Sequence, residues 1–199
     1  QLNDISESAR ASSILHDHEE IEQYLLEFNK TEYAIMPVPS IGMFYLDDKA
    51  DYIKDVLKKG KVWEPRVVDM IKRYAVPGST VIDAGAHIGT HTLVMSRSVG
   101  PHGRVYAFEP QKKLYRELYH NMKLNGVSNV IPMRFAVGDT HQLIEMDPIV
   151  EGNEGSTGVG KGGDSVELRT IDSFAFQNVS LIKIDVERLE REVLAGATK

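Results

Sequence analysis

Asp83, Glu109 and Asp185 stand at the ends of three short apolar runs, and Glu187 lies two residues after the third. A carboxylate can accept hydrogen bonds from hydroxyl and amino groups, and it can take a proton from a hydroxyl group that is about to react. When such runs are parallel strands of one sheet, ligands bind beyond their carboxyl ends. The four acids therefore predict a site for a hydroxylated ligand.

A tight turn follows the first apolar run and carries Gly85 and Gly89. Glycine lets the backbone approach a ligand closely. A dinucleotide fingerprint that begins at Gly85 would also need glycine at positions 87 and 90, so that a pyrophosphate reaches the backbone. His87 and Thr90 stand there instead. The turn thus disfavours NAD and favours S-adenosylmethionine (SAM), a nucleoside cofactor that has no pyrophosphate.

Two carboxylates complete this cofactor prediction. Glu109 lies about 20 residues beyond the turn, where an acid can accept hydrogen bonds from both ribose hydroxyls. Asp83, just before the turn, is expected to bind the amino group of the cofactor directly or through water. Of the histidines, only His87 is expected in the pocket, whereas His91, His102 and His141 are expected on the surface or in loops.

The elements that position these residues alternate between strand and helix. From Thr80 onward, strands are predicted at 80–83, 104–108, 129–137 and 181–185, with helices at 90–99 and 111–125. This order predicts an α/β, doubly wound, Rossmann-like sheet that is truncated after the strand at 180–185. A hairpin of strands at 143–149 and 166–169 interrupts the alternation, around a loop from 151 to 165 that contains six glycines and is expected to be mobile.

The first 60 residues follow a different pattern. An amphipathic helix is predicted for 17–29, one or two strands for 33–46, and a second helix for 51–59 that stops at Gly60. We expect residues 1–60 to form an N-terminal extension of helices and short strands, which could serve as a cover or as the arm of a homo-oligomer. Residues 61–199 would form the SAM-binding domain, without its C-terminal part.

Composition excludes several kinds of chemistry. The 199 residues include no cysteine, so disulfides, zinc–thiolate sites and the thiolate of cytosine C5 methylation are absent. The net charge of −6 and the lack of an Asn/Asp-Pro-Pro-aromatic motif argue against a nucleic-acid substrate. No apolar run approaches the roughly 18 residues that a membrane span needs. A cytoplasmic protein without a membrane span is therefore expected.

Several stretches in series resemble the FkbM-type methyltransferases. They are VIDAGAHIGTHT at 81–92, VYAFEP at 105–110, NMKLNG at 121–126, FAVGD at 135–139, TID at 170–172 and LIKIDVERLEREVLAGA at 181–197. The resemblance implies the class I SAM-dependent methyltransferase fold and O-methylation of a hydroxyl on a small molecule, sugar or lipid-type acceptor. It also implies that the cofactor site contains Glu64, Asp83, Gly85, His87, Gly89, Glu109, Val137 and Asp139. Two residues depart from the family pattern, His87 for the usual asparagine and Arg188 for the usual glycine.

The catalytic residues are expected after the last strand. Asp185 is the first candidate to bind the acceptor or the cofactor amino group, and Glu187 is the second. Alternatively, Asp185 pairs with Lys183 to hold the strand end, and Glu187 caps the next helix. No further metal ligand is visible near these acids, so no metal is expected. The other functions left open are a non-catalytic SAM- or nucleoside-binding domain and an NAD-dependent reductase, which His87 in the turn disfavours.

Overall fold

The computed structural model describes residues 21–199, and the chain divides into two compact units, 1–31 and 32–199. In the first unit, residues 21–26 are helical, which confirms the predicted N-terminal helix over that range. Residues 17–20 of that helix lie outside the described part. A short 3-10 helix, η1 (Lys30–Glu32), follows it along the chain. None of the described helices is long and apolar enough to cross a membrane.

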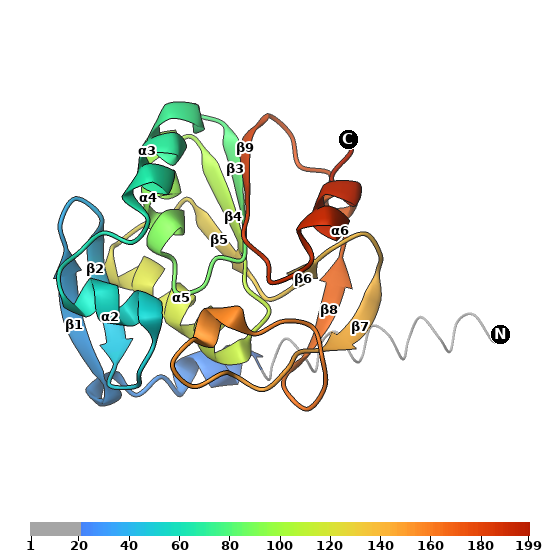
Figure 1. Cartoon of the computed structure of the whole chain (residues 1–199). Helices are drawn as coiled ribbons and strands as arrows, with labels where there is room; N and C mark the ends of the chain where they lie inside the picture. Colours follow the sequence, from blue (N-terminus) through green and yellow to red (C-terminus); the bar gives the residue numbers. More distant parts are fainter. Residues whose placement is uncertain (1–20) are drawn as a thin grey trace. The chain divides into compact units, whose positions relative to one another are not determined.

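Four parallel strands form the central sheet of the second unit. They are β3 (Thr80–Ala84), β4 (Arg104–Phe108), β5 (Val130–Met133) and β9 (Val179–Ile184), in the order β5-β4-β3-β9 (Figure 1). Helix α4 (Thr90–Val99) connects β3 to β4, and α5 (Lys112–Leu124) connects β4 to β5. The strand order reverses between β3 and β9, which confirms the doubly wound fold. Ligands of such sheets bind beside this point, at the carboxyl ends of the strands.

Alternate residues of each strand point to opposite faces of the sheet and build two cores. Val81 and Val105 face a core shared with α3 (Pro65–Tyr74), α4 and α5. Ile82 and Phe108 face a second core under η3 (Ile171–Phe174) and α6 (Glu190–Ala195). Figure 1 shows α3, α4 and α5 on one side of the sheet and α6 on the other. Both faces are covered, so the strands read as continuous apolar runs.

The segment before the sheet belongs to the first of these cores. Strands β1 (Tyr33–Val38) and β2 (Gly42–Asp47) form an antiparallel hairpin, and α2 (Tyr52–Lys58) follows it. Phe44 and Leu57 are buried in the same cluster as Leu93 of α4. The unit that contains the parallel sheet therefore begins at Glu32, whereas the sequence pattern predicted a boundary after residue 60.

A second, smaller sheet interrupts the alternation, as predicted. It contains β6 (Ala136–Val137), β7 (Gln142–Glu145) and β8 (Ser165–Arg169) in the order β6-β8-β7. Strands β7 and β8 pair antiparallel, which confirms the hairpin, while β6 pairs with β8 in parallel. The long loop between β7 and β8 includes a short 3-10 helix, η2 (Glu154–Ser156). This loop reaches the carboxyl ends of the central strands.

Candidate active site

A cavity of about 280 Å³ lies at the carboxyl ends of β3, β4 and β9. Three segments that directly follow these strands form one side of it, through Gly85 and His87, Glu109 and Gln111, and Asp185 and Glu187. The loop between β7 and β8 forms another side with Asn153, Gly155, Thr157, Gly158 and Val159. The cavity thus lies where a doubly wound sheet places its ligand.

The turn after β3 adopts an unusual backbone conformation. Gly85, His87 and Gly89 all have positive φ angles, of +80°, +52° and +93°. A methyl group on Gly85 would overlap the carbonyl oxygen of Asp185, so only glycine fits at this edge of the cavity. Asparagine and histidine are both enriched among non-glycine residues with positive φ. This shared tolerance explains how His87 can stand where the resemblance expects asparagine.

Gly89 has a different role from Gly85. A Cβ atom there would lie 2.7 Å from Cε of Met122 and 2.8 Å from Cδ1 of Leu118, both on α5. Gly89 does not line the cavity. Gly89 therefore allows the start of α4 to pack closely against α5. A direct role of Gly89 in binding the cofactor stays a prediction.

Glu109 is buried at the cavity and is held by two backbone amides. The N–H of His87 donates to Oε2 at 2.9 Å, and the N–H of Gln111 donates to Oε1 at 3.0 Å. Burial raises the pKa of this carboxyl to about 7, although both amide hydrogen bonds lower it. Each oxygen keeps a second lone pair. The carboxyl group is thus fixed by the turn and can still accept hydrogen bonds from a ligand.

Asp83 is fully buried and does not line the cavity. Its carboxylate accepts a hydrogen bond of 2.6 Å from Oγ1 of Thr92 and one of 3.1 Å from Nζ of Lys183. Nζ of Lys183 also donates to the carbonyl of Gly85 at 2.9 Å and lies 3.6 Å from Asp185. Burial opposes the charge of Lys183, but Asp83 and Asp185 outweigh it and raise its pKa. Asp83 therefore stabilises the turn from outside the cavity, through the Lys183 side chain that bonds both Asp83 and the carbonyl of Gly85.

The imidazole of His87 is buried, lines the cavity, and has no hydrogen-bond partner for either ring nitrogen among the described residues. Burial lowers its pKa to about 4, so the ring is neutral near neutral pH. A neutral imidazole carries one donor and one acceptor nitrogen. His87 can therefore offer both to a ligand in the cavity.

His91 is buried rather than exposed, so its predicted surface position is wrong. It lies on α4, whose residues from Thr90 to Ser96 are all buried between the sheet and its neighbours. Burial, followed by the charge of Lys183, lowers the pKa of His91 to about 4. Its Nε2 lies 3.8 Å from the carboxylate of Glu64, which precedes α3 with a φ of +41°.

The remaining predicted residues divide into two groups. Val137, Asp185 and Glu187 line the cavity, and both acids are exposed to solvent. Glu64 and Asp139 are absent from its wall, although Trp63 beside Glu64 contributes to it. Glu187 does not cap α6, because the cap position is Leu189 and no side chain bonds there. Their roles in binding and catalysis stay predictions.

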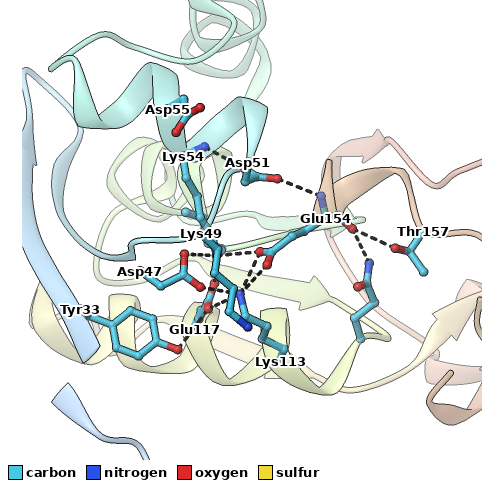
Figure 2. A network of polar contacts seen from close by, with 12 residues as sticks. Tyr33, Asp47, Lys49, Asp51, Lys54, Asp55, Lys113, Glu117, Glu154 and Thr157 are labelled. Atoms are coloured by element: carbon cyan, nitrogen blue, oxygen red, sulfur yellow. Dashed lines mark hydrogen bonds and ion pairs between the residues drawn. The ribbon is translucent and has the colours of Figure 1, made fainter. Parts of the chain in front are cut away.

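Sequence reasoning missed the side of the cavity formed by the loop between β7 and β8, together with the residues that hold that loop. Glu154 of this loop belongs to a buried group of charged side chains that also contains Asp47, Lys54, Lys113 and Glu117 (Figure 2). Asp47, Glu117 and Glu154 lie close enough together to hold a metal ion. However, Nζ of Lys54 lies 2.7 to 3.1 Å from an oxygen of each. The lysines supply the positive charge there, so these acids do not fit a metal site.

Comparisons with known proteins find methyltransferases. The model described as "Methyltransferase FkbM domain" matches residues 83–199, more than half of the chain. The hexuronic acid methyltransferase AglP of Haloferax volcanii is 28% identical over 141 residues, which cover 68% of this chain and 56% of that protein. Methyltransferase 1 of Beauveria bassiana is 29% identical over 145 residues, which cover 59% and 58% of the two chains. The chain thus spans less than two thirds of the length of either relative.

Among solved structures, similarity is partial. TYW2 from M. jannaschii, in complex with AdoMet, is 28% identical with a TM-score of 0.38, over 53% of this chain and 44% of that one. A SAM-dependent O-methyltransferase from Thermotoga maritima is 22% identical with a TM-score of 0.34, over 50% and 39% of the two chains.

Proposed function

Because residues 83–199 match its model, the chain belongs to the FkbM methyltransferase domain family, and we propose that it transfers a methyl group from SAM to a hydroxyl group. The observation that carries this proposal is the position of Glu109. Its carboxyl group lies at the cavity beside the turn 85–89 and is fixed there by the amides of His87 and Gln111. This is the place where a nucleoside cofactor of a doubly wound fold presents its ribose.

The residues at the cavity fit SAM in three ways. Glu109 would accept hydrogen bonds from the ribose hydroxyls. His87 has two buried ring nitrogens that a ligand would satisfy, and buried polar atoms are rarely left without a partner. The carboxylate of Asp185 at the cavity would attract the positive charge of the cofactor. SAM would supply an electrophilic methyl group to the acceptor.

Methyl transfer to oxygen needs alignment of the two reactants and removal of the hydroxyl proton. Asp185 and Glu187 both line the cavity, at the carboxyl end of β9. We propose that they bind the acceptor hydroxyl and accept its proton. Asp185 is tied to the turn through Lys183, which bonds the carbonyl of Gly85, so a base at this position would keep a constant relation to the cofactor.

The charge of the cavity supports a neutral acceptor. Its wall contains three carboxyl groups, those of Glu109, Asp185 and Glu187, and no lysine or arginine among the residues described. An acceptor with its own carboxylate would find no cation to pair with in this wall. Although the name of AglP includes a hexuronic acid, we therefore propose a neutral hydroxylated acceptor, such as an uncharged sugar. Methylation rates of a neutral sugar and of its uronic acid, measured side by side, would compare the two classes.

Calorimetric titration tests the cofactor assignment. SAM, S-adenosylhomocysteine (SAH) and NAD are titrated into the parent chain, into Glu109→Ala, and into Glu190→Ala, an exposed control on α6. We expect SAM and SAH to bind the parent and the control, NAD to bind neither, and Glu109→Ala to lose at least about tenfold in SAH affinity, or about 1.4 kcal/mol. Tight binding of NAD without binding of SAM or SAH would refute the proposal. Formation of SAH when hydroxylated acceptors are added would then distinguish an enzyme from a binding domain.

A further inference from the structure

One side of the cavity is a strap, residues 152–160, which is anchored at both ends. At its start, the N–H of Gly152 donates to the carbonyl of Ala50 at 3.1 Å. At its end, Val159 forms a bridge with Met146, and the carbonyl of Gly158 accepts a hydrogen bond of 2.9 Å from Asp147. Asn153, Gly155, Thr157 and Gly158 line the cavity between these anchors. Their position depends on what holds the middle of the strap.

Glu154 holds the strap from the side away from the ligand. It does not line the cavity, and only 3% of its surface is exposed. Its Oε2 lies 2.7 Å from Nζ of Lys54, and its Oε1 lies 2.7 Å from Nζ of Lys113 (Figure 2). Its N–H donates to Asp51, and its carbonyl accepts hydrogen bonds from Gln111 and Thr157. Every polar group of this residue is therefore engaged.

The two lysines are themselves fixed by the rest of the domain. Lys54 of α2 is fully buried, and its Nζ also lies 3.1 Å from Asp47 of β2 and 2.9 Å from Glu117 of α5. Lys113 lies 2.8 Å from each of the same two acids. Burial raises the pKa of Glu154, but the lysines outweigh it and lower the pKa overall. Moving Glu154 away would leave the fully buried Lys54 and the partly buried Lys113 with fewer partners, which is costly.

The strap contacts the residues that face the ligand. A methyl group on Gly155 would lie 3.3 Å from Cδ2 of His87, so the strap lies directly against this imidazole. A methyl group on Gly158 would lie 3.8 Å from Cβ of Glu187. The strap therefore lies close beside both the cofactor turn and the segment after β9. A displacement of its middle would open the cavity and release the ring of His87.

We propose that Glu154 is a positioning residue for the cofactor, which acts by holding the strap against His87 through its ion pairs with Lys54 and Lys113. The inference rests on the proposed function, because it takes the ligand of the cavity to be SAM. It assigns to this buried charge group a role in cofactor affinity in addition to stability.

The test uses Glu154→Gln, which keeps the side-chain shape and removes the charge. Glu151→Gln is the matched control, because Glu151 is an exposed glutamate three residues earlier in the same loop. Calorimetric titration with SAH should show about tenfold weaker binding for Glu154→Gln, equal to about 1.4 kcal/mol, with unchanged stoichiometry. Glu151→Gln should match the parent. A purely structural role would instead lower the stoichiometry and leave the affinity of the folded fraction unchanged, and this result would overturn the proposal.

Limited trypsin digestion provides a readout that does not depend on SAH. Lys161, just after the strap, is exposed and is the only lysine or arginine between residues 151 and 165. Cleavage after Lys161 should be faster in Glu154→Gln than in the parent or in Glu151→Gln, and equal rates would contradict the proposal. If the parent did not bind SAH, the proposed function would fall, while the cleavage rates would still decide whether Glu154 positions the strap. Lys113→Gln, which leaves Lys54 in place, should shift both readouts in the same direction by a smaller amount.

Discussion

The cavity has two sides that are built by different physical means. On one side, the turn 85–89 and the carboxyl group of Glu109 are held by contacts between segments that directly follow neighbouring strands. On the other side, the strap is held by Glu154, whose lysine partners lie 41 and 100 residues away in the sequence. The shape of the first side is determined by the backbone conformation of the turn 85–89. The second depends on charges that only the folded domain brings together.

The two sides of the cavity should therefore tolerate different kinds of amino-acid substitution. The turn needs residues that accept positive φ, so its tolerance is decided by backbone conformation. The strap is held by the ion pairs of Glu154 with Lys54 and Lys113, so a substitution there should be tolerated only if it keeps the charge. On the turn side, the loss of stability should depend mainly on the size and backbone preference of the new residue. On the strap side, it should depend mainly on the charge of the new residue.

Removal of Lys54 should have the largest effect on stability. Lys54→Met leaves Asp47, Glu117 and Glu154 buried with one lysine instead of two, which should lower the free energy of unfolding by about 4 kcal/mol. Lys58→Met, on the same helix, removes a partly exposed ion pair with Asp55 and an exposed hydrogen bond to the carbonyl of Lys49, and should cost about 1 kcal/mol or less. Urea denaturation of both variants measures the difference. Equal losses would show that the buried charges do not hold the strap side.

Substitution of Gly85 tests the turn side and should cost somewhat less. Gly85→Ala combines positive φ with an overlap at Asp185, which together should lower the free energy of unfolding by about 3 kcal/mol. It should also abolish SAH binding. Gly78→Ala is the control, because Gly78 has a φ of +79° but open space around it, and should cost about 1 kcal/mol. Denaturation and SAH titration of the two variants distinguish the overlap from the backbone conformation.

The pH dependence of stability tests the burial of Glu109. Since burial raises its pKa to about 7, ionisation of Glu109 is unfavourable in the folded state, and its contribution to stability decreases as the pH rises from about 4.5 to 7. Relative to Glu109→Gln, the parent should therefore lose up to about 3 kcal/mol between pH 5 and pH 8. The histidines are common to both proteins and cancel in this difference. A difference that stays constant over this range would contradict the raised pKa.

Arg188 should show the smallest effect. It has a φ of +69°, in the left-handed region that favours glycine, at the position where the FkbM resemblance expects glycine. Arg188→Gly should raise the free energy of unfolding by about 0.5 to 1 kcal/mol, because it removes this backbone strain. Thermal unfolding would detect the increase as a higher Tm. A lower Tm would mean that contacts of the arginine outweigh the strain.

The same contrast explains how much the sequence could predict. Hydrophobic periodicity and glycine positions located β3, β4, β9 and the connecting helices, since these signals are local. They also placed Gly85, His87 and Glu109 at one cavity. Asp83 was expected at the ligand, but its bonds to Thr92 and Lys183 depend on which strands are neighbours. The loop 151–165 was expected to be mobile because of its six glycines. Nothing near Glu154 in the sequence indicates that it pairs with Lys54 and Lys113.

A crystal structure of the chain with SAH would test the central claim most directly. We expect the carboxyl group of Glu109 to accept hydrogen bonds from the ribose hydroxyls while it keeps those from the amides of His87 and Gln111. A ribose bound elsewhere, with Glu109 bonded only to those amides, would contradict it.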